Sequence, residues 1–182
     1  MSATQVLIAG FGGQGVLFAG KFLAYAGLLQ GRNVSWLPSY GPEMRGGTAN
    51  CSVILSDCQV GSPIVTQPDI LMAMNLPSLD KYEAEVQTGG VILYDSSLIS
   101  RPVQRSDVRV CAVPAASLAT DHGLDALANM ILSGCMIAQT GVIPYDMAEK
   151  ALSKVVSARH ADLLGKNLEA VSLGYQYKQE ER

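Results

Sequence analysis

Charged residues are scarce in this chain of 182 residues, since Asp, Glu, Lys and Arg make up only 16 % of it. Soluble domains usually carry about 25 %. The shortage is consistent with either a large α/β core or a surface that a partner covers. The net charge of −3 gives no indication of nucleic acid or an anionic membrane as a partner. No apolar run reaches the ~20 residues that span a bilayer, and residues 1–5 lack the basic segment of a signal peptide. We therefore expect a cytoplasmic protein.

The chain also lacks the usual patterns of metal and nucleophile sites. None of the four cysteines falls in a CxxC pair, and their spacing fits neither a zinc site nor an iron–sulfur cluster. The two histidines, His122 and His160, are isolated, and there is no G-x-S-x-G motif. The sequence therefore predicts no catalytic residue and no metal site. The cysteines are Cys51, Cys58, Cys111 and Cys135.

Short apolar runs alternate with segments of helical spacing along the chain. We expect strands at 5–9, 33–37, 48–55, 69–74, 91–94 and 108–113, and helices at 15–29, 77–86, 124–139, 144–155 and 161–177. This order predicts an α/β fold: one three-layer, Rossmann-like domain over residues 1–182, with a mainly parallel sheet. Because no crossover helix precedes 48–55, that strand can run antiparallel, which would make the sheet mixed.

The first glycine-rich segment, GFGGQG at 10–15, lies between an expected strand and an expected helix. It fits the G-x-G-x-x-G pattern, in which glycines let the backbone approach a ligand and the helix start attracts phosphate. A dinucleotide site also needs an acid at the end of the second strand, but that strand ends in Pro38 and the next acid is Glu43. Two interpretations stay open besides a dinucleotide site: a turn that needs glycines for packing, and a loop that meets a phosphate-bearing ligand or a partner subunit. The candidate binding residues here are Gly12, Gly13, Gln14 and Gly15.

The second glycine-rich segment, PSYGPEMRGG at 38–47, joins the second and third expected strands. Arg offers planar, bidentate recognition of a carboxylate or phosphate. The alternative is a rigid loop in which Glu43 and Arg45 pair with each other. We expect both glycine-rich segments to lie at one edge of the sheet and to form a docking surface. The candidate residues here are Ser39, Tyr40, Glu43, Arg45, Gly46 and Gly47.

Together the two segments carry a resemblance to a known family. GFGGQGVLFAGKFLA and SYGPEMRGGTANCSVILSD, followed by Gly61-Ser62-Pro63, resemble the gamma subunit of 2-oxoacid:ferredoxin oxidoreductases of anaerobic metabolism, such as the pyruvate, 2-oxoglutarate and ketoisovalerate enzymes. The resemblance covers essentially the whole chain, although the part after Ala161 is generic.

The resemblance implies a noncatalytic subunit of a larger complex. Such a complex oxidises a 2-oxoacid to an acyl-CoA and reduces ferredoxin, using thiamine diphosphate, Mg, iron–sulfur clusters and coenzyme A. The alpha, beta and delta partners hold the thiamine diphosphate and the clusters; this chain has no GDG…N diphosphate motif and holds no cofactor alone. The gamma subunit packs on the thiamine-binding subunits and is associated with coenzyme A access. From the two glycine-rich segments we form a hypothesis for the roles of their residues. Backbone N–H groups of 12–15 meet a phosphate of coenzyme A, and Arg45, oriented by Glu43, reaches this ligand or a partner carboxylate. Gly46 and Gly47 permit close approach of another backbone.

Two other classes of function fit the first glycine-rich segment alone. A stand-alone dinucleotide-binding oxidoreductase would bind its cofactor without partners, and a nucleotide-sensing module would bind a mononucleotide tightly.

Two polar residues also follow expected strands, at the edge where α/β sheets bind ligands. We expect Asp95 to cap a turn, and Asn75 is a further site candidate.

Overall fold

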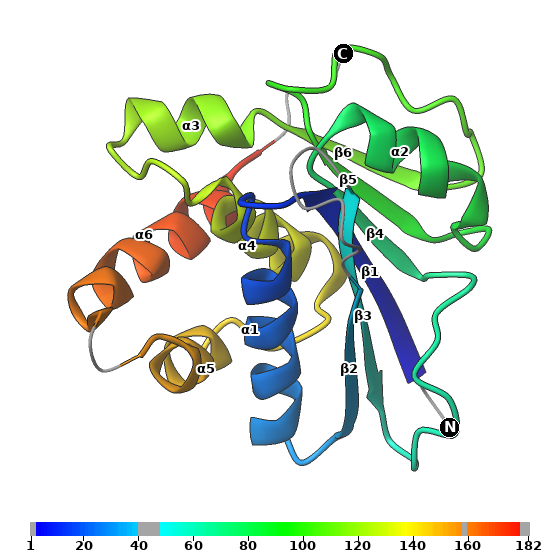
Figure 1. The fold of residues 1–182 in the computed structure, drawn as a ribbon, viewed down its shortest axis with the longest axis horizontal. Helices are drawn as coiled ribbons and strands as arrows, with labels where there is room; N and C mark the ends of the chain where they lie inside the picture. The colour runs from blue at the N-terminus through cyan, green and yellow to red at the C-terminus, as the bar shows by residue number, and fades with distance from the viewer. Residues whose placement is uncertain (1–2, 40–47, 158–159, 179–182) are drawn as a thin grey trace.

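The structure, a computed structural model, describes residues 3–39, 48–157 and 160–178 (Figure 1). Its centre is one six-stranded sheet of order β2-β3-β1-β4-β5-β6. β4, β5 and β6 continue parallel to β1, whereas β3 runs antiparallel to both β1 and β2. The α/β fold with a mixed sheet is therefore confirmed. The strands are β1 (Ala3–Phe11), β2 (Asn33–Ser39), β3 (Thr48–Ser56), β4 (Ile70–Ala73), β5 (Val91–Asp95) and β6 (Arg109–Val113).

Helices cover both faces of this sheet and make the expected three layers. Figure 1 shows α1, α4, α5 and α6 on one side and α2 on the other, with the short 3-10 turn η1 following α2. No helix in the described part of the chain is long and apolar enough to cross a membrane. The helical elements are α1 (Val16–Leu29), α2 (Leu76–Tyr82), η1 (Glu83–Glu85), α3 (Ala115–Asp121), α4 (Ala128–Thr140), α5 (Met147–Val155) and α6 (Asp162–Gln176).

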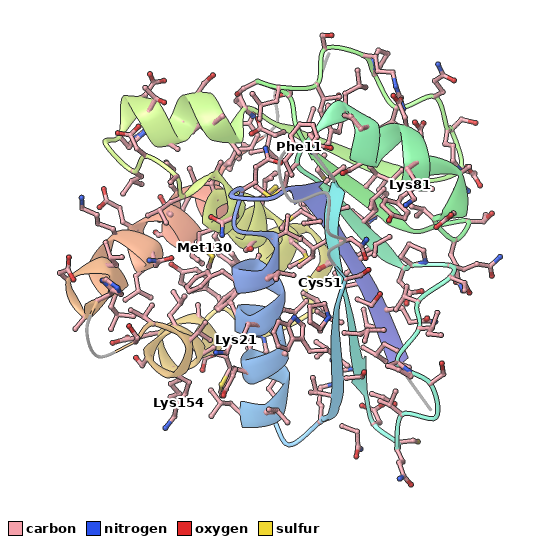
Figure 2. The ribbon with its side chains drawn as sticks, in the orientation of Figure 1. Phe11, Lys21, Cys51, Lys81, Met130 and Lys154 are labelled. Atoms are coloured by element: carbon pink, nitrogen blue, oxygen red, sulfur yellow. The ribbon has the colours of Figure 1, made fainter. Side chains whose placement is uncertain are left out.

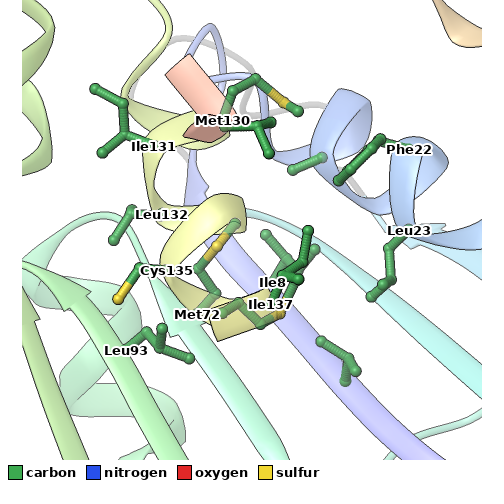
Figure 3. Packing of buried hydrophobic residues seen from close by; sticks show 14 of the residues in the cluster. Ile8, Phe22, Leu23, Met72, Leu93, Met130, Ile131, Leu132, Cys135 and Ile137 are labelled. Atoms are coloured by element: carbon green, nitrogen blue, oxygen red, sulfur yellow. The ribbon is translucent and has the colours of Figure 1, made fainter. Parts of the chain in front are cut away.

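β1 is apolar on both faces because it lies between two helical layers. Its side chains alternate: Val6 and Ile8 belong to the core under α1 and α4, and Leu7 and Ala9 to the core under α2. Figure 3 shows the larger core, where α1 and α4 side chains meet those of the strands. The labelled residues are Ile8, Phe22, Leu23, Met72, Leu93, Met130, Ile131, Leu132, Cys135 and Ile137.

β2 continues through Pro38 instead of ending there as the sequence predicted. The register pairs Pro38 with Cys51 and Ser39 with Asn50. β2 is an edge strand, and an edge strand tolerates proline because one of its sides forms no ladder bonds. The prediction was wrong because it let proline end the strand, whereas proline ends only a central strand and is tolerated in an edge strand.

The segment after β6 also differs from the prediction. A short helix, α3, was not expected, and the helix predicted over 124–139 begins only at Ala128. Gly123 and Ala126 adopt left-handed conformations, with φ of 64° and 67°, and these interrupt a continuous helix. The prediction from Pro144 was similarly early, since α5 begins at Met147.

Candidate functional site

Both glycine-rich segments leave the sheet at the same edge. β1 ends at Phe11, which pairs with Thr48, the first residue of β3. Ser39, the last residue of β2, pairs with Asn50 of β3. The described residues that flank both segments therefore lie at the edge where β1 ends, as expected. Five candidates of the second segment lie outside the described residues: Tyr40, Glu43, Arg45, Gly46 and Gly47.

The first segment turns tightly from β1 into α1, and two of its glycines have positive φ. Gly15 is the N-cap of α1 with φ of 75°. A Cβ on Gly15 would lie 2.3 Å from the side-chain nitrogen of Asn129, so both conformation and packing require glycine here. Gly13 has φ of 92°, but a Cβ there would meet no atom within 4 Å. The backbone around Gly12 and Gly13 is exposed. This part of the loop can therefore approach another molecule closely.

Asn129 supports the glycine loop from α4, and sequence analysis did not single it out. Its Nδ2 donates to the carbonyl of Gly15 at 3.1 Å. The residue is buried, and its Oδ1 has no hydrogen-bond partner among the described residues. Asn129 and Gly15 are 114 positions apart in the sequence, which explains why no local signal revealed the contact.

Gln14 links the loop to the end of β4 through its side chain. Its Oε1 accepts from the N–H of Phe11 at 2.6 Å, and its Nε2 donates to the carbonyl of Met74 at 3.1 Å. Asn75 Nδ2 lies 3.4 Å from the same Oε1. After β1 the chain moves toward β2, and after β4 it moves toward β5. Gln14 therefore lies where the chain connections that follow β1 and β4 run in opposite directions along the sheet. This position is the usual ligand site of open α/β sheets.

The start of α1 supplies the positive end of a helix beside this loop. Its N-cap, Gly15, makes no side-chain hydrogen bond, and its first turn contains no acidic residue. The first N–H groups of a helix have no partners within the helix and carry partial positive charge. The segment can therefore favour a negatively charged group near Gly12 and Gly13.

A cavity of about 240 Å³ lies beside the loop, between the ends of β4 and β5 and α3. Two carboxyl groups line it, those of Asp95 and Asp125, so the cavity interior does not favour a phosphate. Its lining residues are Gly13, Gln14, Met74, Asp95, Leu98, Ala116, Ala119, Thr120, Asp125, Ala126 and Ala128.

Asp95 and Asn75 act as caps at this edge. Asp95 is fully buried; its Oδ1 accepts from Ser97 N at 3.0 Å and its Oδ2 from Ala116 N at 3.1 Å. Burial raises the pKa of its carboxyl, an effect that these backbone donors oppose. Asn75 Oδ1 accepts from Ser78 N at 2.9 Å and caps α2. The cap expected for Asp95 is confirmed, and the same Asp95 explains why the short α3 forms.

The topology does not support the hydrogen bond between an acidic residue and the ribose that a dinucleotide site needs. In that site an acid follows a strand adjacent to β1. Here β2 is separated from β1 by β3, which places Ser39 about 10 Å from β1 at ordinary strand spacing. Ser39, the last residue of β2, is also not acidic, so it does not supply the carboxylate that would bind the ribose.

The cysteines and histidines form no reactive cluster in the described ranges. No group of three metal-binding side chains is found there. Cys51 is buried, and burial raises the pKa of its thiol to about 12. Cys111 and Cys135 are also buried, and a hydrogen bond between their thiols lowers the pKa of Cys111. His122 follows α3, with its Nδ1 3.0 Å from the carbonyl of Leu118.

Comparison with known proteins places this chain in a family. The family model described as pyruvate ferredoxin/flavodoxin oxidoreductase matches residues 5–177. Ketoisovalerate oxidoreductase subunit VorA of Methanothermobacter thermautotrophicus is 43 % identical over 178 residues, which cover 97 % of this chain but 36 % of that protein. This chain thus spans about a third of that relative. 2-Oxoglutarate synthase subunit KorC of Methanocaldococcus jannaschii is 33 % identical over 179 residues, covering 97 % of this chain and 94 % of KorC.

A solved structure agrees with this assignment. The gamma subunit of a keto/oxoacid ferredoxin oxidoreductase from Geobacter sulfurreducens matches with a TM-score of 0.81 and 32 % identity, covering 95 % of this chain and 96 % of that one. The resemblance seen in the two glycine-rich segments is confirmed by these relatives. Since the family match runs over residues 5–177, this chain belongs to the pyruvate ferredoxin/flavodoxin oxidoreductase family.

Proposed function

We propose that this chain is the noncatalytic gamma subunit of a multisubunit 2-oxoacid:ferredoxin oxidoreductase. The complex would oxidatively decarboxylate a 2-oxoacid, release an acyl-CoA and reduce ferredoxin. The observation that carries the proposal is the family match over residues 5–177. The relatives VorA and KorC, both named as oxidoreductase or synthase subunits, support it. Thiamine diphosphate, Mg and the iron–sulfur clusters would reside in the alpha, beta and delta partners.

The glycine loop suits a phosphate of coenzyme A. Gly12 and Gly13 are exposed, and a Cβ on Gly13 would meet no atom within 4 Å, so another molecule can approach closely there. The start of α1 adds partial positive charge without an acidic residue in its first turn. Coenzyme A would supply the thiol that accepts the acyl group in the complex. This chain's own part would be to bind and orient the phosphate through backbone N–H groups of the 12–15 loop. The N–H of Gln14 already donates to the carbonyl of Phe11 at 3.2 Å, which leaves those of Gly12, Gly13 and Gly15 for the ligand.

Side chains around the loop would keep its shape for that contact. Gln14 holds the loop to Met74, and Asn129 holds Gly15 from α4. Because the polar atoms of Gln14 are already hydrogen bonded, Gln14 would act by positioning the backbone and would not touch the ligand itself. The carboxyl group of Asp125, which lines the neighbouring cavity, would disfavour a phosphate there and leave the exposed side of the loop as its place.

We further propose that the second glycine-rich segment completes the docking surface. Arg45 would bind a phosphate or a partner carboxylate, and Glu43 would orient its guanidinium. Ser39 and Tyr40 would flank that contact, while Gly46 and Gly47 would let another backbone approach. The shared edge of the two segments supports this arrangement, since Phe11 and Thr48 are paired in the sheet.

Purification of the tagged chain from its native cells tests the function. We expect larger chains that bind thiamine diphosphate and iron–sulfur clusters to co-purify, and the preparation to reduce ferredoxin only when both a 2-oxoacid and coenzyme A are present. If the chain came down alone, or if it turned over a 2-oxoacid unaided, the proposed function would be wrong.

Arg45→Ala in the purified complex tests the second segment. We expect at least a tenfold rise in the KM for coenzyme A or a matching loss of assembly, because one charge-assisted bidentate contact contributes about 1.5–3 kcal/mol. Lys154→Ala is the control, because Lys154 is an exposed cation on α5, on another part of the surface (Figure 2). Unchanged assembly and unchanged kinetics in Arg45→Ala would contradict the role of Arg45.

A further inference from the structure

α1 has an unusual sequence for a helix at the surface of a domain. Its 14 residues, VLFAGKFLAYAGLL, contain one charged side chain, Lys21. A surface helix normally has a polar outer face, whereas a helix that is apolar on all sides is normally buried. α5 lies beside α1 and keeps the ordinary pattern, with Glu149, Lys150 and Lys154 exposed on its outer side. Of these two helices, only α1 has an apolar outer side.

The inward side of α1 is fully accounted for by its own domain. Eight residues, at helical spacing, are buried against the sheet and the neighbouring helices. Figure 1 shows α5 and α6 on one side of α1 and β2 on the other, with none of the described elements drawn across its outward side. We call the outward residues the α1 face. Leu28 and Leu29 are its exposed members, and Lys21 is half-buried. Leu17, Phe18 and Tyr25 are half-buried and pack partly against the core of this domain, so they contribute only part of their surface.

The α1 face has the composition of a protein–protein interface. Leu28 is 54 % exposed and Leu29 is 41 % exposed, although both are large and apolar. Trp36, on the edge strand β2, extends the surface: it is 37 % exposed, and its indole lies against α1 at Gly20. Contiguous exposed apolar patches with large aromatic residues are typical of interaction sites.

The relatives indicate that the module has a lasting partner. The region equivalent to this chain makes up 94 % of KorC but only 36 % of VorA. The same module therefore occurs alone and as about one third of a longer chain. A module that is covalently joined in one relative needs a lasting noncovalent interface where it is separate, and lasting interfaces are large and apolar.

We propose that the α1 face, with Trp36, is the docking surface for the subunit that corresponds to the remaining part of the longer VorA chain. This inference rests on the proposed function. The partner surface would be apolar, with one carboxylate opposite Lys21, because Lys21 is the only charge of the α1 face and lies 5.9 Å from the Tyr25 ring. α1 begins directly at the glycine loop, so a subunit seated here would also border the proposed coenzyme A site.

Leu28→Glu in the tagged full-length chain tests the proposal in native cells. Leu28 is the most exposed apolar residue of the α1 face, and a charge there should lower the amount of co-purified subunit at least tenfold. Leu163→Glu is the matched control, because Leu163 is an exposed leucine of similar exposure, 39 %, on α6. We expect Leu163→Glu to retain the subunit within twofold of wild type. Protection of the buried Cys51 thiol from alkylation shows that each variant is folded.

A photo-crosslinking residue at position 28 gives a direct second measurement. It should join this chain to a larger oxidoreductase subunit, whereas the same residue at position 163 should not. The proposal is overturned if folded Leu28→Glu retains wild-type association, or if position 28 crosslinks only to a second copy of this chain. If the wild-type chain brings down no oxidoreductase subunit, the proposed function itself has failed, and that outcome is distinct from the first two.

Discussion

Gly174→Ala should destabilise this protein, although alanine is the better helix former. α4 and α6 cross so closely that Gly134 of α4 lies against the backbone of α6, and Gly174 of α6 lies against the backbone of α4. A Cβ on Gly174 would lie 1.8 Å from the carbonyl oxygen of Ile131, and a Cβ on Gly134 would lie 2.0 Å from the carbonyl oxygen of Val171. Real Cβ contacts essentially never fall under 3.0 Å, so Gly174→Ala must push the helices apart by about 1 Å at the crossing.

The size of the effect follows from two opposing contributions. Replacing glycine by alanine inside a helix contributes about 1 kcal/mol of stability. Overpacking costs about 1–3 kcal/mol, and the upper end applies here because a backbone carbonyl, unlike a side chain, cannot rotate away. The free energy of unfolding should therefore fall by about 2 kcal/mol. For a domain of this size the melting temperature should drop by roughly 4–8 °C.

Gly165→Ala provides a control within the same helix. Gly165 also lies in α6, but a Cβ there would meet no atom within 4 Å. This variant should gain about 0.5–1 kcal/mol. Urea unfolding followed by circular dichroism measures both variants. Opposite signs are expected; if Gly174→Ala proved as stable as Gly165→Ala, the close contact between α4 and α6 would be refuted.

Three further predictions concern the loops and buried groups. Iodoacetamide at neutral pH should modify the half-buried Cys58 and leave Cys51 unmodified until the protein unfolds, because the thiolate is the reactive form and burial raises the pKa of Cys51 to about 12; mass spectrometry would refute this by finding equal modification. Gln14→Leu should lower the free energy of unfolding by about 1–3 kcal/mol, since it removes the side-chain hydrogen bonds to the Phe11 N–H and the Met74 carbonyl; an unchanged urea midpoint would contradict it. Glu83→Gln should cost about 2 kcal/mol, because the buried Glu83 carboxylate pairs with Arg101 at 2.7 Å; thermal unfolding at low and high salt measures the loss, and a wild-type melting temperature would exclude it.

Local patterns in the sequence predicted most of the secondary structure. The six strands are found where apolar runs were read, and the strand at 48–56 runs antiparallel as its missing crossover helix allowed. The sequence did not predict α3, because the carboxylate that caps this helix belongs to Asp95 of β5. The sequence also did not predict a role for Asn129, because this residue supports Gly15 from a helix that is distant in the sequence.

The sequence by itself determined the α/β class, the glycine-rich turn between β1 and α1, and the family. These depend on hydrophobic periodicity, on residues with special backbone freedom and on motifs, all of which are local. The sequence also predicted that the two glycine-rich segments share one edge, and the flanking residues agree. Only the tertiary structure decided that Gln14 and Asp95 stabilise that edge from inside, and that Leu28 and Leu29 of the apolar helix α1 are exposed. These features depend on strand order and helix packing, which join residues far apart in the chain.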